Sequence, residues 1–138
     1  MKASTWGALA LVAAMTAAAG VGHAAVYKQE GCQIEVPADW VASKQRVSRP
    51  DKKVWAELLK ASSTAEVVTL ETSLKAVKVG EDGGHVVLMS TASYGGLTNR
   101  MYHTVTKGSP ACLADVTSPA GPDEALAKSI GHTVTIAK

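Results

Sequence analysis

Apolar and polar residues alternate along several short stretches of the chain, with the period of a half-buried strand. In residues 32–36, Cys32, Ile34 and Val36 fall on one face and the residues between them are polar. A hairpin around the turn-forming residues 48–51 is expected from the segments that flank them. The expected strands cover residues 32–36, 41–47, 53–61, 85–93, 100–106, 111–117 and 133–136.

Helical spacing appears twice. Ser63 to Glu66 has the spacing of a capping box, and apolar residues then recur at helical intervals, which predicts a helix over residues 64–78. The residues of this stripe are Val67, Leu70, Leu74 and Val77. Asp123 caps a second, shorter helix that ends at about Gly131. The order of elements favours a single α+β domain, with an antiparallel sheet of about six strands packed with two helices.

The first part of the chain, residues 1–24, has the layout of a secretory signal peptide. A positive end is followed by an apolar run over residues 6–21 and by small residues at the positions that a signal peptidase reads, so cleavage is expected after Ala24. A retained membrane anchor is the alternative, but the run is shorter than the roughly 20 residues that span a bilayer. We expect residues 25–138 to form a secreted or periplasmic domain with no stable membrane anchor after cleavage.

Two cysteines, Cys32 and Cys112, are present in the chain. An even number of cysteines in an oxidising compartment favours a disulfide, and both thiols fall on apolar faces of expected strands. The bridge would close a loop of about 80 residues and contribute on the order of 4 kcal/mol. A redox pair and half of a metal site are the alternatives, although neither has its usual Cys-x-x-Cys spacing here.

The segment Gln33 to Trp40 is a strand followed by proline, two residues and tryptophan. This opening resembles that of the Mog1/PsbP-like fold. The closing part is similar too, with a strand, a short helix that carries Leu126 and Ile130, and a last strand. The resemblance covers most of residues 30–137 and implies an antiparallel sheet flanked by helices. Members of this fold bind a small GTPase, attach to a photosystem or sit in bacterial envelopes, so it implies no particular function.

Residues 44–53 form the most basic stretch of the chain. Its cations are Lys44, Arg46, Arg49, Lys52 and Lys53. This stretch would suit an acidic partner, a lipid headgroup or an envelope polymer. A charged hairpin tip that keeps a sheet edge from aggregating has the same composition. The formal charge of the whole chain is only +2, which argues against nucleic acid as a partner because phosphate neutralisation needs a clustered basic surface.

A glycine-containing loop over residues 94–100 is the second candidate surface. Loops carry much of the binding function of proteins, and the candidate contacts here are Tyr94, Asn99 and Arg100. An ordinary connection between strands would have the same composition.

Known catalytic motifs are absent from the sequence: there is no nucleophile elbow, no His-Glu-x-x-His and no phosphate loop. Three histidines follow the cleavage site, His85, His103 and His132. Histidine is the commonest metal ligand, and histidines from neighbouring strands can converge. A lone histidine at the edge of an apolar face is usually just packed and hydrogen-bonded. A serine nucleophile paired with one of them, with Ser90 or Ser93 near in sequence, is a weaker alternative.

These patterns favour a non-enzymatic binding or accessory protein of the cell envelope. Its partner would be an unidentified envelope protein or an anionic polymer, and no cofactor is expected. The alternative is a metal-binding protein or small periplasmic hydrolase that uses His85, His103 and His132. A thiol redox protein is a third hypothesis, which requires an exposed cysteine of low pKa.

Overall fold

The computed structural model describes residues 15–17 and 24–138. The elements in chain order are β1 (Met15–Ala17), β2 (Ala24–Gln29), β3 (Cys32–Pro37), β4 (Val41–Ala42), β5 (Val47–Ser48), β6 (Trp55–Ala61), α1 (Thr64–Ser73), β7 (Val77–Glu81), β8 (His85–Tyr94), β9 (Leu97–Thr106), β10 (Ala111–Pro119), α2 (Asp123–Gly131) and β11 (Thr135–Ile136).

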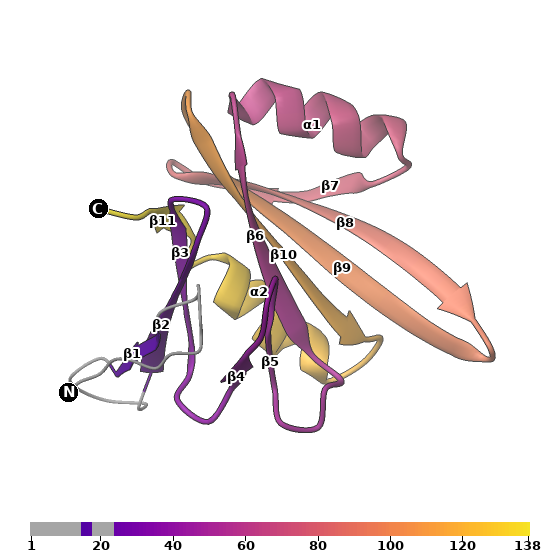
Figure 1. Ribbon diagram of the computed structural model, residues 1–138. Helices are drawn as coiled ribbons and strands as arrows, with labels where there is room; N and C mark the ends of the chain where they lie inside the picture. Colours follow the sequence, from indigo (N-terminus) through magenta and orange to yellow (C-terminus); the bar gives the residue numbers. More distant parts are fainter. Residues whose placement is uncertain (1–14, 18–23) are drawn as a thin grey trace.

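The strands form two antiparallel sheets (Figure 1). The larger sheet has seven strands in the order β4-β5-β6-β10-β9-β8-β7, and the smaller has four in the order β1-β2-β3-β11. The α+β class, the antiparallel pairing, the two helices and the single domain are therefore confirmed. The main sheet is larger than the expected one, and a second sheet holds the first three strands together with the last one.

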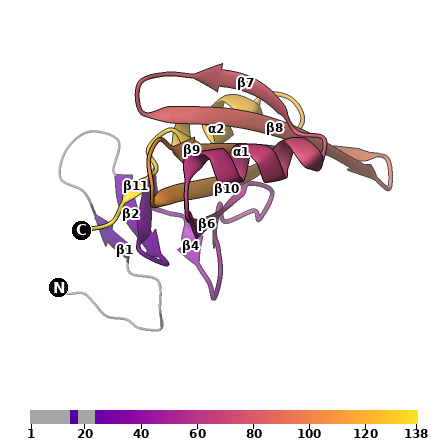
Figure 2. The same ribbon diagram turned by 90° about the horizontal axis from the view of Figure 1, so that it is seen from above.

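Each face of the larger sheet has its own apolar core, because successive residues of a strand point to opposite faces. The smaller sheet and α2 cover one face, where Tyr27, Ile34 and Val116 are fully or almost fully buried. Helix α1 covers part of the other face and packs Val67 against Val105 and its neighbours. Figure 2 shows α1 lying across the strands, with α2 behind them. The sheet is thus the middle layer of the molecule.

A disulfide joins Cys32 of β3 to Cys112 of β10, which confirms the expected pairing. Both residues are 0% exposed. The bridge connects the smaller sheet to the larger one across a sequence separation of 80 residues. Complete burial also removes the exposed thiol that the redox hypothesis requires.

Helix α1 ends earlier than the sequence predicts, and the prediction was wrong for its last part. The helix stops at Ser73 instead of continuing to residue 78. Lys75 has a φ of 76°, which turns the chain out of the helix, and residues from Val77 onward pair with β8 as the edge strand β7. Pairing with a neighbouring strand outweighs the local helical spacing.

The face that α1 buries also differs from the predicted stripe. Leu70 is 54% exposed and Leu74 is 62% exposed. The helix buries Val67, as predicted, but its other buried residue is the carboxylate residue Glu71. Beneath α1, a polar contact made by Glu71 therefore replaces part of the expected apolar contact.

Several turns and ends also differ from the sequence predictions. The expected strand over residues 41–47 is divided into β4 and β5, which pair in a hairpin of their own, and the turn between β5 and β6 covers residues 49–54 instead of 48–51. The expected loop over residues 94–100 is mostly strand, because β8 and β9 meet at Gly95 and Gly96. These glycines have φ values of 59° and 78°, as a two-residue hairpin turn requires. The last strand is only Thr135–Ile136.

The predicted signal peptide over residues 1–24 lies mostly outside the described residues. Of that segment, residues 15–17 pair with β2 as β1. Within the part of the chain that the structure describes, neither helix is long and apolar enough to cross a membrane. Removal of residues 1–24 stays a prediction.

Candidate functional site

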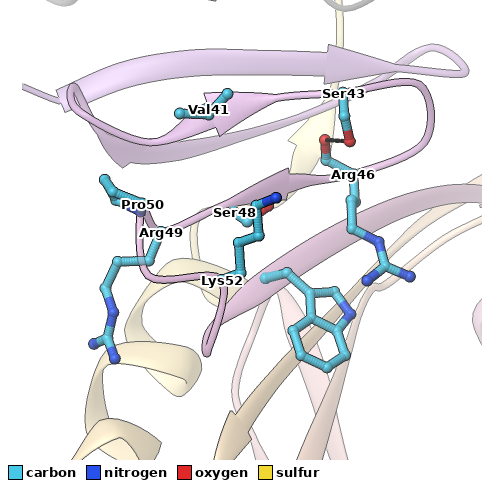
Figure 3. A pocket seen from close by; sticks show the side chains of 8 residues that line it. Val41, Ser43, Arg46, Ser48, Arg49, Pro50 and Lys52 are labelled. Carbon is cyan, nitrogen blue, oxygen red and sulfur yellow. Dashed lines mark hydrogen bonds between the residues drawn. The ribbon is translucent and has the colours of Figure 1, made fainter.

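A hollow lined by described residues lies beside the short strands β4 and β5 and has a volume of about 360 Å³ (Figure 3). We call it the basic hollow. Its lining residues are Val41, Ser43, Arg46, Ser48, Arg49, Pro50, Lys52 and Trp55. The lining holds three cations and no acidic residue. The structure thus brings together three of the basic residues that the sequence singles out, Arg46, Arg49 and Lys52.

Arg46 is held in place at the edge of the basic hollow. Its guanidinium carbon lies 4.9 Å from the ring centroid of Trp55, within the range of a cation–π contact. One of its nitrogens lies 3.0 Å from a carboxylate oxygen of Glu57, and its side chain is still 44% exposed. Arg46 is therefore an oriented cation that a ligand can reach.

Arg49 is more fully occupied than the sequence suggests. Its guanidinium donates two hydrogen bonds to Asp123, of 2.9 and 3.0 Å, and a third of 3.0 Å to Asp51. The hydrogen bond from Arg49 is the main reason that the pKa of Asp123 is lowered. In Figure 3 Arg49 turns away from Lys52, toward a neighbouring helix. The residue serves mainly to tie this turn to α2.

Lys52 is exposed and forms no ion pair with any described residue. It has a φ of 63°, so the turn that carries it is tight. The other two predicted contacts, Lys44 and Lys53, lie outside the lining of the basic hollow. Lys52 is therefore the cation best placed to meet a ligand.

The residues of the second predicted surface, 94–100, lie in β8, in β9 and in the turn between them, and their role in partner binding stays a prediction. Asn99 and Arg100 are neighbours in β9 and point to opposite faces of the sheet. Arg100 donates a 2.7 Å hydrogen bond to the hydroxyl of Thr91 and lies 3.4 Å from Glu124. The side chain of Tyr94 lies outside what the structure describes.

Asn99 instead lines a second, smaller hollow of about 150 Å³. Its lining residues are Trp55, Ser90, Thr91, Ala92, Asn99, Met101 and Thr117. Trp55 lines both hollows. The two hollows therefore adjoin on the surface of the larger sheet.

Ser90, on the wall of this second hollow, begins a chain of polar contacts across three strands. Its Oγ lies 2.7 Å from Nε2 of His103, and Nδ1 of His103 lies 2.7 Å from Oδ1 of Asp115. A second carboxylate lies nearby, because Oε1 of Glu71 in α1 is 3.6 Å from Nε2 of His103. We call these four residues the His103 cluster. The order hydroxyl, imidazole, carboxylate is that of a Ser–His–Asp triad.

The charge state of His103 follows from its two acidic neighbours. Burial by itself lowers the pKa of His103, whose side chain is 4% exposed, but the hydrogen bond to Asp115 and the charges of Asp115 and Glu71 together raise it. The folded protein therefore favours the imidazolium more than an ordinary histidine does. Sequence reasoning considered His103 and Ser90 but missed Asp115, whose place opposite His103 depends on the register between β9 and β10.

The three histidines of the alternative metal-binding hypothesis do not all come together. His103 lies opposite Leu88 in the β8–β9 ladder, so it is on the other face of the sheet from His85. His85 and His132 do come together, with their ring centroids 4.6 Å apart. Asp82 lies beside both, 3.0 Å from Nε2 of His132 and 3.8 Å from Nδ1 of His85.

Comparisons with known proteins give only a fold. No protein-family model and no curated protein matches this chain. Among solved structures it is similar to a protein of Bacteroides thetaiotaomicron VPI-5482 whose crystal structure has a resolution of 1.50 Å, with a TM-score of 0.55 and 15% identity. The match covers 78% of this chain and 46% of that chain, so this chain spans less than half of that protein. Identity this low shows the shared α+β fold alone.

Proposed function

We propose that this protein is an exported, non-enzymatic binding module of the cell envelope that takes an anionic polymer in the basic hollow. The observation that carries the proposal is a hollow of about 360 Å³ lined by Arg46, Arg49 and Lys52 without any acidic residue. Export is supported by the signal-peptide layout of residues 1–24 and by the disulfide, a bond that persists in oxidising compartments.

The lining residues would have different roles toward such a ligand. Lys52 supplies a mobile ammonium for carboxylate, sulfate or phosphate groups. Arg46, oriented by Trp55 and Glu57, supplies a planar guanidinium that can bind an oxyanion through two hydrogen bonds. Trp55 adds a broad apolar surface against which the backbone of a polymer can pack.

The test compares binding of dextran sulfate and uncharged dextran by isothermal titration calorimetry. The variant is Arg46→Ser with Lys52→Ser. A matched control, Lys28→Ser with Lys138→Ser, removes the same charge from two exposed residues outside the basic hollow. We expect the parent to bind only dextran sulfate. The hollow variant should bind it at least about tenfold more weakly, since hydrogen bonds to charged groups contribute about 1.5–3 kcal/mol, and the control should bind like the parent.

Two results would contradict the proposal. Equal weakening in both double variants would mean that the polymer responds only to net charge. Absence of binding by the parent at low salt would exclude a polyanion site of this kind.

The Mog1/PsbP-like assignment is also our proposal, and two features support it. Trp40, three residues after Pro37, is 4% exposed and packs in the core on the α2 face. The short helix α2 leads into β11, which pairs with β3. Both features agree with the opening and the closing segments on which the resemblance rests.

A second function, hydrolysis of an ester by Ser90, is favoured by the two 2.7 Å contacts of the His103 cluster. In this reaction Ser90 Oγ attacks the ester carbonyl while Nε2 of neutral His103 accepts its proton. Because the pKa of His103 is raised, this form becomes dominant only at higher pH than for an ordinary histidine. The alcohol leaves with that proton, and water then hydrolyses the acyl-serine. Beyond Met89, β9 is the only strand among the described residues that pairs with β8. Alternate backbone N–H groups on its free edge could stabilise the oxyanion.

A fluorophosphonate probe distinguishes this function from mere packing. An active Ser90 should be labelled, and the label should disappear in Ser90→Ala but not in Ser93→Ala, which replaces an exposed serine of the same strand. A parent protein that stays unlabelled, or that is labelled equally in Ser90→Ala, would leave the His103 cluster with a structural role only.

A further inference from the structure

Two elements far apart in sequence bring a carboxylate and two imidazoles together. Asp82 lies in the turn between β7 and β8, His85 is the first residue of β8, and His132 caps the C-terminus of α2. One potential ligand atom from each residue can be chosen so that all three lie within 4.8 Å of one another. This group is separate from the basic hollow and from the His103 cluster.

We propose that Asp82, His85 and His132 bind a zinc ion. Zinc takes imidazole nitrogen and carboxylate oxygen in tetrahedral sites. Ligands about 2.0 Å from a tetrahedral ion are about 3.3 Å from one another. Nε2 of His132 lies 3.0 Å from Oδ2 of Asp82, and Nδ1 of His85 lies 3.8 Å from the other carboxylate oxygen, Oδ1. All three ligand atoms lie within 4.8 Å of one another, so closing each pair by at most about 1.5 Å gives the separations of a tetrahedral ion.

The orientation of His85 supports the proposal, because a hydrogen bond to a residue outside the group fixes which of its ring nitrogens faces Asp82. Nε2 of His85 lies 2.9 Å from the backbone carbonyl of Val134. A carbonyl only accepts, so Nε2 carries the hydrogen and Nδ1 of the neutral ring presents its lone pair toward Asp82. Metal-binding histidines commonly donate their second ring nitrogen to a carbonyl or carboxylate in this way.

The carboxylate is held in a similar manner. Oδ1 of Asp82 accepts hydrogen bonds of 2.8 Å from the backbone N–H groups of Gly84 and His85. These two bonds are the main reason that the pKa of Asp82 is lowered. Oδ2 faces His132. The turn thus fixes the aspartate and leaves its second oxygen directed into the group.

Exposure and charge both suit a metal with open coordination positions. The side chains of Asp82 and His132 are 46% and 54% exposed, whereas that of His85 is 14% exposed. Water could therefore complete the coordination of the ion. A cation here would also lie beside the C-terminus of α2, where the helix dipole favours positive charge.

Zinc titration of the untagged protein, after chelator treatment and dialysis, tests this inference. We expect one ion per chain by calorimetry and a rise in melting temperature with zinc. His132→Gln should weaken binding at least about tenfold, the usual order for loss of a metal contact. Asp82→Asn should do the same, although asparagine can still accept the two backbone hydrogen bonds through its amide oxygen. Asp39→Asn, a change at an exposed carboxylate outside the group, is the matched control.

The melting temperatures separate a metal site from a simple ion pair. If Asp82 and His132 only stabilise the turn, His132→Gln should lower the melting temperature by the same amount with and without zinc. That result would overturn the inference, as would a dissociation constant weaker than about 1 mM, which corresponds to only about 4.1 kcal/mol. A zinc-induced rise that is lost in His132→Gln and Asp82→Asn and kept in Asp39→Asn would support it. The outcome is independent of polyanion binding, because none of these residues lines the basic hollow.

Discussion

Arg49 and Asp123 are joined by two parallel hydrogen bonds, of 2.9 and 3.0 Å, between the guanidinium and both carboxylate oxygens. The pair connects the turn after β5 to the first residue of α2. Its bidentate geometry is the favourable one for arginine and carboxylate, and Asp123 also places negative charge at the N-terminus of a helix. The contact fastens one wall of the basic hollow to the rest of the fold.

Replacement of Arg49 should therefore change stability, unlike replacement of Lys52. We expect Arg49→Ser to lower the melting temperature by a few degrees, because it leaves Asp123 without its bidentate partner. Lys52→Ser should leave the melting temperature unchanged, since Lys52 has no ion pair with a described residue. Thermal unfolding followed by circular dichroism measures both. Equal melting temperatures for the two variants would show that the Arg49 contact contributes nothing measurable.

The sequence pattern predicted those parts of the fold that depend on residues close together in the chain. The alternation of Cys32, Ile34 and Val36 gave the buried face of β3 correctly. The disulfide followed from cysteine number and compartment. The bounds of α2 agree with the predicted ones, but the predicted end signals were wrong. The N-cap is Pro122, without a side-chain capping hydrogen bond, so Asp123 is the first helical residue, and Gly131 is still helical because the C-cap is His132.

The rest depends on contacts between distant segments, which one sequence does not contain. Asp115 meets His103 only in the observed register, and a shift by one residue would move it to the other face. Asp82 meets His132 only after α2 has packed on the sheet. The prediction for α1 was too long because Leu74 and Val77 continue the helical spacing. In the structure, Val77 instead pairs with β8 as part of β7.

The disulfide should account for a large part of the stability of the domain. Cys32 and Cys112 lie 80 residues apart and connect the two sheets. In the chain-entropy model, a bridge over a loop of this length contributes on the order of 4 kcal/mol. We expect the double variant Cys32→Ala, Cys112→Ala to lose about that much unfolding free energy in urea. A loss below about 1 kcal/mol would mean that the unbridged chain is already restrained when unfolded.

Stability should fall as the pH rises through the titration of His103. The pKa of His103 is raised in the folded protein because Asp115 and Glu71 outweigh the effect of burial. The folded state therefore binds this proton more tightly than the unfolded chain does. The resulting stabilisation is complete below the unfolded pKa of about 6.5 and is lost as the pH rises through the folded pKa.

Urea unfolding between about pH 5.5 and 8.5 measures this effect. The free energy of unfolding should decrease with pH more steeply in the parent than in His103→Gln. Glu71→Gln removes one negative charge near the imidazole and should give an intermediate slope. Identical slopes in all three proteins would contradict a raised pKa at His103.

The last residue of α2, Gly131, packs against β9 so closely that a side chain cannot fit. A Cβ at this position would lie 2.7 Å from Oγ1 of Thr104 and 3.3 Å from its Cβ. Thr104 is 0% exposed, and its branched side chain has few alternative rotamers. Alanine in place of glycine usually stabilises a helix interior by about 1 kcal/mol. Here we expect Gly131→Ala to lower the unfolding free energy by about 1–3 kcal/mol, as overpacking does.

A double-mutant cycle identifies Thr104 as the cause. Thr104→Ala removes the hydroxyl that Gly131→Ala would meet, and this hydroxyl has no hydrogen-bond partner among the described residues. In that background Gly131→Ala should lower the unfolding free energy much less, with a coupling of about 1 kcal/mol or more between the two sites. Urea denaturation of the four proteins gives this coupling. The same loss in both backgrounds would mean that Gly131 is required for its backbone conformation and not for the close approach of α2 to β9.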